Sequence, residues 1–199
     1  MHARLLTFSQ LHDVDRAVVF LHETALSVLK KQFGFRGVSV GVDRKGSVVA
    51  MLSLWANESA IESSYRPLLE AREQALALSG ASLNVEHFEQ VSELVARPPG
   101  AGSWVMLTRF RVEPRSLNDE LLYFESEFVP ELVRLPGFCS VRNLVDRYSG
   151  RGVTGTTWEG RRAMKSADAK LPRNRPGAAA QGILFGETAQ LELLLFEQG

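Results

Sequence analysis

The sequence predicts an α+β fold made of two tandem β-α-β-β-α-β units. Residues 34–55 and 137–158 align without a gap, 103 positions apart, and are identical at seven of 22 positions. A period of about 100 residues is too long for a solenoid repeat and fits a duplicated small domain. A Pro- and Gly-rich segment at residues 96–103 marks the boundary, because neither a helix nor a strand should continue through it. The identical pairs are Gly34/Gly137, Phe35/Phe138, Val38/Val141, Val42/Val145, Asp43/Asp146, Arg44/Arg147 and Trp55/Trp158.

The first unit is expected over residues 1–95. Asp13 can cap a helix whose apolar residues follow a three-four spacing up to Gly34, which should end it. Alternating valines predict the next strand, and an Asp-Arg-Lys-Gly turn predicts its return. Pro67 should interrupt the second helix. The expected elements are a strand at 4–9, a helix at 13–34, strands at 38–42 and 48–55, a helix at 58–78 and a strand at 83–91.

The second unit is expected over residues 104–199, after the linker at 96–103. Ser116 is a candidate N-cap with an acid three residues later, and Pro130 should bend the helix that follows. The helix after Trp158 should be short, because Pro172, Pro176 and Gly177 follow it. The expected strands are 104–112, 141–146 and 152–158, then an apolar run at 183–185 and a closing strand at 191–196. This order is that of a ferredoxin-like unit.

Composition narrows the classes of partner and compartment. Hydrophobic residues make up 45% of the chain, enough for a buried core, and 23 basic residues balance 23 acidic ones. We therefore expect neither nucleic acid nor a membrane as a partner. The single cysteine, Cys139, excludes an intrachain disulfide and fits a reducing compartment. With no apolar run of about 18 residues and no signal-like start, a cytoplasmic location is expected.

Two short motifs carry a resemblance to a known family. Pro136-Gly137-Phe138 and Thr157-Trp158-Glu159, with Gly34-Phe35 and Trp55 through Glu58 in the first half, resemble the antibiotic-biosynthesis-monooxygenase (ABM) type of the dimeric α+β barrel superfamily. In that family a helix ends in Pro-Gly-Phe, and the third strand ends in Trp-Glu. The resemblance implies two ferredoxin-like units packed sheet to sheet as an intrachain dimeric α+β barrel. We therefore expect a pseudo-dimer, and further homodimerisation stays open.

The resemblance also implies a function. It favours a cofactor-independent monooxygenase that acts on a small aromatic or phenolic molecule, with no cofactor and no metal. An indole at the end of the third strand would give an aromatic ligand a flat apolar wall and one N–H donor. The alternative is that each indole is a core residue closing the sheet. The candidate substrate-binding residues are Trp55, Trp158, Tyr65, Phe35 and Asn57, and the catalytic residues are left open.

Departures from the family pattern favour a second hypothesis. Monooxygenating members carry an asparagine on the first strand, and neither expected first strand has one; the counterpart of Asn57 is Gly160. Haem-degrading members carry a histidine on the helix after the tryptophan, and none of the four histidines lies there. A non-catalytic small-molecule-binding or stress-related barrel is therefore the alternative. If one site works, the first unit near Trp55 and Tyr65 is the expected place.

Other polar patterns receive a structural interpretation. The acidic residues on two expected helix faces, one after Trp55 and one after Ser116, are interpreted as solvated surface and not as metal ligands. Asp43 and Asp146 are expected to bond to the backbone of their turns. The first set of acidic residues is Glu62, Glu70 and Glu73, and the second is Glu120, Glu125, Glu127 and Glu131.

Overall fold

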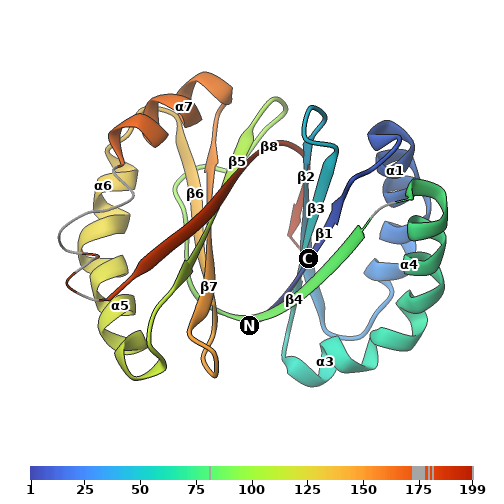
Figure 1. Ribbon diagram of the computed structural model, residues 1–199, viewed down its shortest axis with the longest axis horizontal. Helices are drawn as coiled ribbons and strands as arrows, with labels where there is room; N and C mark the ends of the chain where they lie inside the picture. The colour runs from blue at the N-terminus through green and yellow to red at the C-terminus, as the bar shows by residue number, and fades with distance from the viewer. Residues whose placement is uncertain (81, 172–177, 179, 181, 199) are drawn as a thin grey trace. The chain divides into compact units, whose positions relative to one another are not determined.

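The first half of the chain folds as β-α-β-β-α-β in the computed structural model, which describes residues 1–80, 82–171, 178, 180 and 182–198 (Figure 1). Its first helical region has three parts, a five-residue π-helical segment lying between two α-helices. The elements are β1 (His2–Ser9), α1 (Val14–Phe20), the π-helix η1 (Leu21–Ala25), α2 (Leu26–Lys30), β2 (Phe35–Asp43), β3 (Val48–Trp55), α3 (Glu58–Ser63), α4 (Tyr65–Ser79) and β4 (Ser82–Val95).

The second half repeats this order, including the π-helical segment, which lies 103 positions after the first. The closing region is one long strand where the sequence predicted a short apolar run and a separate strand. The elements are β5 (Trp104–Arg111), the 3-10 helix η2 (Pro114–Ser116), α5 (Leu117–Tyr123), the π-helix η3 (Phe124–Phe128), α6 (Val129–Val133), β6 (Phe138–Asp146), β7 (Arg151–Trp158), α7 (Arg161–Lys170) and β8 (Leu184–Gln198).

The strand order identifies both units as ferredoxin-like. In the first unit β1 and β2 pair antiparallel with β3, and the order is β4-β1-β3-β2. In the second unit β5 and β6 pair antiparallel with β7, and the order is β8-β5-β7-β6. With the strands of each unit numbered from one, both orders are 4-1-3-2. This agreement confirms the predicted α+β class with two β-α-β-β-α-β units.

The compact units do not follow the chain in two uninterrupted pieces. One unit contains Met1–His87 together with the chain from Leu194 onward, and the other contains Phe88–Leu193. The second part of β4 accordingly pairs with β6, from Glu89 opposite Val145 to Val95 opposite Ser140. The predicted division into 1–95, 96–103 and 104–199 follows the sequence repeat instead and stays a prediction.

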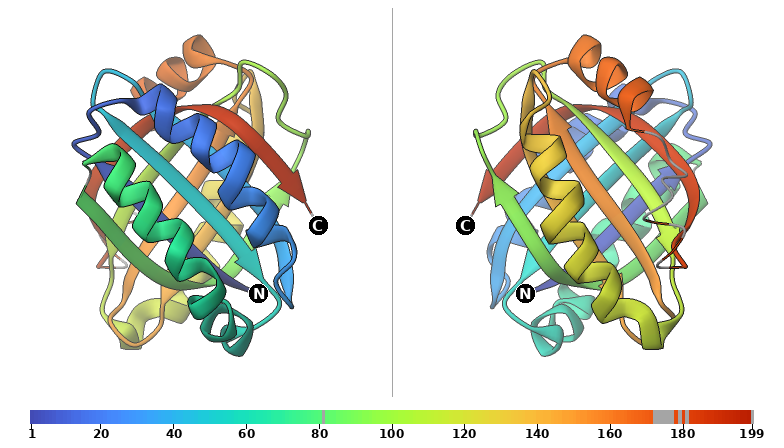
Figure 2. Two further views of the ribbon diagram at one scale, coloured as in Figure 1. Left: turned by 90° about the vertical axis from the view of Figure 1, so that its right-hand side faces the viewer. Right: turned by 90° about the vertical axis from the view of Figure 1, so that its left-hand side faces the viewer.

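Helices cover one face of the sheet in each unit. Figure 2 shows α1 and α4 lying side by side over the strands of the first unit, and α5 with α6 over those of the second. Beneath them lie separate clusters of buried apolar side chains, which include Leu29 and Val49 in the first unit and Leu132 and Met164 in the second. The clefts between helices and sheet are therefore the places where a ligand could be enclosed. No helix among the described residues is long and apolar enough to span a membrane.

Steric constraints explain why glycine recurs at positions 34 and 137. Gly34 and Gly137 have φ angles of +75° and +79°, a backbone region that L-residues with side chains rarely adopt. A Cβ atom on either would lie 2.6 Å from the Cβ of Ala60 or Ala163, respectively. Each glycine carbonyl also accepts a hydrogen bond from the residue after the tryptophan, at 2.7 Å from the nitrogen of Ala56 in the first unit. The glycine is thus required where the chain passes close to the next helix.

The turn and cap predictions have mixed outcomes. Asp13 caps α1 by accepting from the Arg16 N–H at 2.9 Å, as predicted. Asp43 and Asp146 bond to their turns as predicted, the first by accepting from the Lys45 N–H at 3.0 Å. Ser116 makes no side-chain capping bond, because η2 precedes α5 and its last residue already has a near-helical backbone.

The predicted helix after Trp55 is divided, as expected, and Ser64 is the residue at the break. Pro67 lies in the first turn of α4, where its missing N–H is not needed. The helix after Trp158 is short, ending at Lys170. The prolines and the glycine predicted to end it, Pro172, Pro176 and Gly177, lie outside the described residues.

Candidate functional site

The two repeated tryptophans are fully buried, and each has its only donor occupied. The indole N–H of Trp55 donates to the Ser53 hydroxyl at 3.0 Å, and that of Trp158 donates to the Thr156 hydroxyl at 3.0 Å. In each case the acceptor is two residues earlier on the same strand. Neither indole is among the residues that line the cavities described below. These placements fit the core alternative, and a substrate-binding role stays a prediction.

The other three predicted site residues are Phe35, Asn57 and Tyr65, and each has a different environment. Phe35 packs edge-on against Trp55, with ring centroids 5.9 Å apart and an interplanar angle of 81°. Asn57 is the N-cap of α3, where its Oδ1 accepts from the Ala60 N–H at 3.0 Å. Tyr65 is 54% exposed. The structure therefore brings Phe35 and Trp55 together, and gives Asn57 a structural contact.

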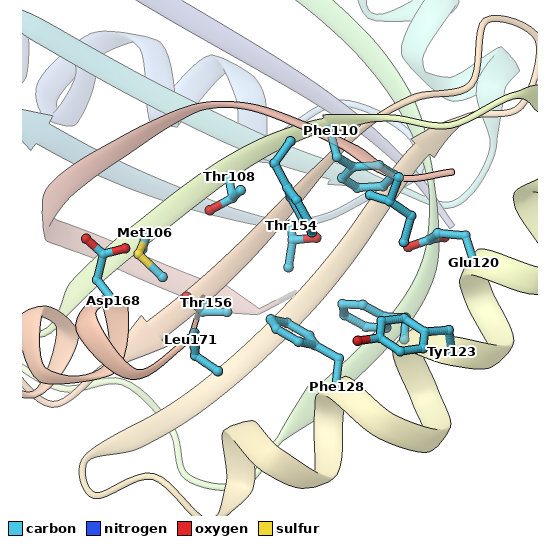
Figure 3. A pocket seen from close by; sticks show the side chains of 13 residues that line it. Met106, Thr108, Phe110, Glu120, Tyr123, Phe128, Thr154, Thr156, Asp168 and Leu171 are labelled. Carbon is cyan, nitrogen blue, oxygen red and sulfur yellow. The ribbon is translucent and has the colours of Figure 1, made fainter. Parts of the chain in front are cut away.

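A mainly apolar cavity lies in the second unit, between the strands β5 and β7 and the helices α5 and α7 (Figure 3). Its volume, measured for the centre of a water-sized sphere, is about 70 Å³. A single water needs roughly 10–15 Å³ on this measure, so several waters or a small organic group would fit. The lining residues are Met106, Thr108, Phe110, Glu120, Tyr123, Phe124, Phe128, Thr154, Thr156, Asp168, Leu171, Ile183 and Phe185.

Glu120 is the titratable group that distinguishes this cavity. Its side chain comes from α5 and is 3% exposed (Figure 3). One carboxyl oxygen, Oε1, accepts from the Asn143 amide at 3.2 Å, and Oε2 has no hydrogen-bond partner among the described residues. Burial raises the pKa of Glu120 to about 7, although the bond from Asn143 acts in the opposite direction. A carboxyl with such a pKa can take up or release a proton near neutral pH.

A short polar chain fixes the orientation of this carboxyl. The Oδ1 of Asn143, which is fully buried, accepts from the Thr154 hydroxyl at 3.3 Å. The amide of Asn143 is therefore held with its nitrogen toward Glu120 and its oxygen toward Thr154. This arrangement leaves Oε2 as the acceptor available to a ligand.

The remaining polar groups of the cavity have contacts of their own. The hydroxyl of Thr108 lies 3.3 Å from that of Thr188, and Thr156 accepts from Trp158. The carboxylate of Asp168 accepts from the Gln190 amide at 3.0 Å. Phe124 and Phe128, with ring centroids 5.5 Å apart, supply flat apolar walls. The arrangement suits a small aromatic molecule with one polar substituent.

The first unit has two cavities of different character. A wider groove of about 250 Å³ lies beside η1 and is lined by apolar residues and by His22 and Glu23, which are both exposed. A smaller, partly open space of about 20 Å³ lies between the sheet and α4, and Arg4 and Arg72 are its polar lining residues. Neither contains a buried carboxyl group.

The interpretation of Glu120 as solvated surface was wrong. Leu117, Glu120 and Phe124 lie three and four residues apart, so they share one face of the helical region, and all three are buried. That spacing was visible in the sequence. A carboxylate on an apolar helix face indicates a buried acid, although only the fold shows whether a cavity lies beside it. Within the described part of the chain, no group of three or more His, Cys, Asp or Glu side chains is placed to hold a metal ion.

Comparison with known proteins identifies related sequences. No protein-family model matches this chain. The uncharacterized protein Rv2557 of Mycobacterium tuberculosis (strain ATCC 25618 / H37Rv) is 27% identical over 166 residues, which cover 83% of this chain and 74% of its own. The uncharacterized protein Rv2558 of the same strain is 28% identical over 166 residues, covering 82% and 70%.

Solved structures identify the fold class. An anthrone oxidase-like protein superimposes with a TM-score of 0.69 at 16% identity, covering 99% of this chain and 93% of its own. A Listeria monocytogenes ferredoxin-fold protein related to antibiotic biosynthesis monooxygenases gives 0.57 at 8% identity, covering 98% and 95%. A monooxygenase-like protein from Listeria innocua gives 0.54 at 8% identity, with the same coverage. The chain therefore shares the fold of these proteins, which is the ABM-like, ferredoxin-like fold that its motifs predicted.

Proposed function

We propose that this protein is a cofactor-independent monooxygenase that oxidises a small phenolic molecule in the cavity of the second unit. The observation that carries the proposal is the buried Glu120, whose Oε2 lacks a partner and whose pKa is about 7. It lies in a cavity with aromatic walls, as a phenolic ring requires. The anthrone oxidase-like protein of similar fold supports this class of substrate.

Glu120 acts as the general base in this mechanism. Its ionised Oε2 accepts the phenolic proton, and the phenolate transfers one electron to O2, which gives a substrate radical and superoxide. These combine to form a carbon–oxygen bond and, after return of the proton, a ring hydroperoxide. Loss of water from the hydroperoxide gives a quinone, so one phenol and one O2 yield one quinone and one water. The apolar walls favour charge transfer to O2 because no water competes in stabilising the phenolate.

The test is oxygen consumption by the purified protein with small phenols, in wild type and in Glu120→Gln. Glutamine keeps the acceptor for Asn143 but cannot take the proton. We expect kcat to fall by about 10²–10⁴-fold, the usual contribution of a positioned general base. The wild-type kcat/KM should rise with pH through about 7, as Glu120 ionises, and the variant should lack this rise.

The control variant is Glu125→Gln, which makes the same change at an exposed position in η3. It should retain the wild-type rate. Equal rates in wild type and Glu120→Gln would reject Glu120 as the base. Quinone formed from substrate without loss of O2 would reject oxygenation itself.

A second candidate function is small-molecule binding without catalysis. It is favoured by the engagement of both indole N–H groups within the protein and by the largely apolar lining of the cavity. Saturable binding of small phenols with no O2 consumption at any pH between 5 and 9 would establish this alternative. The two candidates are thus separated by turnover and not by binding.

A further inference from the structure

Two arginines of the first unit line the same small cavity. Arg4 comes from β1 and is 1% exposed, which is rare for an arginine. Arg72 comes from α4 and is partly buried. The rest of the lining is apolar, so the two guanidinium groups are its polar features. The other lining residues are Leu6, Phe8, Leu21, Ala25, Leu29, Met51, Leu68, Ala71 and Ala75.

Each arginine has the same pair of nitrogen atoms without a partner. Nε and Nη2 of Arg4, and Nε and Nη2 of Arg72, are buried and have no hydrogen-bond acceptor among the described residues. The Nη1 of Arg4 is occupied, since it donates to the Ser64 hydroxyl at 3.0 Å. Nε and Nη2 lie on one edge of a guanidinium group, and together they can hold both oxygens of a carboxylate.

Each guanidinium group lies over an aromatic ring. The central carbon of Arg4 lies 5.0 Å from the centroid of the Trp55 ring, and that of Arg72 lies 5.1 Å from the Tyr65 ring. Such contacts hold a guanidinium plane in one orientation. These contacts restrict the two side chains, and their Nε and Nη2 atoms stay buried without an acceptor among the described residues.

The local electrostatics favour an anion at this position. Burial and the charge of Arg72 lower the pKa of Arg4 to about 10, and burial also lowers the pKa of Arg72. The same two charges also affect His87. Partial desolvation and the charges of Arg4 and Arg72 lower the pKa of His87, whereas the charge of Glu58 raises it. Buried like charges without a counter-ion are unfavourable. An anion between the two arginines would remove this cost.

We propose that the first unit binds a small organic carboxylate, held between the Nε and Nη2 edges of Arg4 and Arg72. The partly open space of about 20 Å³ is the size of one or two waters, so it fits the carboxylate group itself, while the body of the ligand extends along the apolar lining. The apolar walls, including Leu6, Phe8 and Met51, suit a short apolar body better than a fully hydrated anion such as phosphate. This site is independent of the cavity that holds Glu120 and of the proposed oxygenation.

The experiment is calorimetric titration and thermal unfolding of the full-length chain with butyrate, benzoate and inorganic phosphate at constant ionic strength. Butyrate or benzoate should bind saturably and raise the Tm. Arg72→Gln should weaken this binding about tenfold or more, because one bidentate contact is lost. Arg66→Gln, an exposed change on the same helix, should bind as the wild type does.

Without any ligand, Arg72→Gln should unfold at a Tm equal to or higher than that of the wild type, since a charge close to Arg4 is removed. An arginine with only a structural role would give a lower Tm instead. Arg4→Gln is the second variant, and Arg72→Gln carries the test if the Arg4 variant does not fold. Equal carboxylate binding by wild type and Arg72→Gln would overturn the proposal. Binding of phosphate alone would overturn the choice of an organic carboxylate, and no binding by the folded wild type would overturn the site.

Discussion

Both units hold a phenylalanine ring edge-on against a buried tryptophan: Phe35 lies 5.9 Å from Trp55, and Phe138 lies 5.6 Å from Trp158. In both, the indole N–H donates to a hydroxyl two residues earlier on the strand, and a glycine with positive φ faces an alanine on the next helix. These shared residues determine the local backbone conformation and the core packing of each unit. The sequence repeat therefore preserves the contacts that fold each unit.

The residues that face the cavities differ between the units. Strand pairing places Arg4 opposite Ser53 and Met106 opposite Thr156, so the buried arginine of the first unit corresponds to a methionine of the second. Glu120, Asn143 and Thr154 form a hydrogen-bonded chain in the second unit. The residues 103 positions before them cannot form such a chain. Those counterparts are Ala17, Val40 and Met51. Within the same fold, the second unit thus places a buried carboxyl group at its cavity and the first unit a buried guanidinium group.

The strongest test of the shared frame is to add one methyl group to its glycine. Gly34→Ala and Gly137→Ala should each lower the free energy of unfolding by about 2–5 kcal/mol, from backbone strain and the clash with Ala60 or Ala163. Urea unfolding measures the change. Gly100→Ala, where nothing lies within 4 Å, should be neutral. A large loss for one unit and none for the other would break the equivalence.

The next test concerns the buried acid that only the second unit carries. The folded protein holds the Glu120 proton up to about pH 7, whereas the unfolded chain releases it near the ordinary pKa of 4.5. The folded state thus binds more protons in this window, so the unfolding free energy falls as pH rises from about 4.5 to about 7. The fall attributable to Glu120 should be on the order of 3 kcal/mol.

Chemical unfolding of wild type and Glu120→Gln across this pH range isolates the effect. The variant should lack the decline and exceed the wild type in stability above pH 7. Glu125→Gln should follow the wild-type curve, since that carboxyl is exposed. Parallel curves for wild type and Glu120→Gln would show that the acid is not buried as described.

The smallest expected effect comes from the tryptophans. Trp55→Phe and Trp158→Phe should each cost about 1–3 kcal/mol, because each loses buried ring area and a hydrogen bond. Thermal unfolding with and without a phenolic ligand measures both stability and binding. If both indoles serve the core, the two losses match and ligand affinity does not change. Weaker ligand binding by one variant alone would establish the predicted binding role for that indole.

The sequence was sufficient for most of the elements and for the fold type, because local forces set them. Asp13 bonds to a backbone N–H three residues away, and the Asp43 and Asp146 turns close within two or three residues. The duplicated Gly-Phe and Trp positions of the sequence predict two ferredoxin-like units and a fold of the ABM type. Ser116 is not a cap because it is the last residue of a 3-10 helix that begins at Pro114 and precedes α5.

The candidate sites depended on contacts between distant segments, and these only the tertiary structure decided. Arg4 and Arg72 line one cavity although 68 positions separate them, and Glu120 accepts a hydrogen bond from Asn143, which lies 23 positions later. The sequence placed Arg4 in a strand and Glu120 on an apolar helix face, but not the partner opposite either one. Burial and pairing set the charge state of such groups, and both come from packing. The sequence therefore determined the secondary structure and the fold type, and tertiary packing determined the environment and the charge state of the buried ionisable groups.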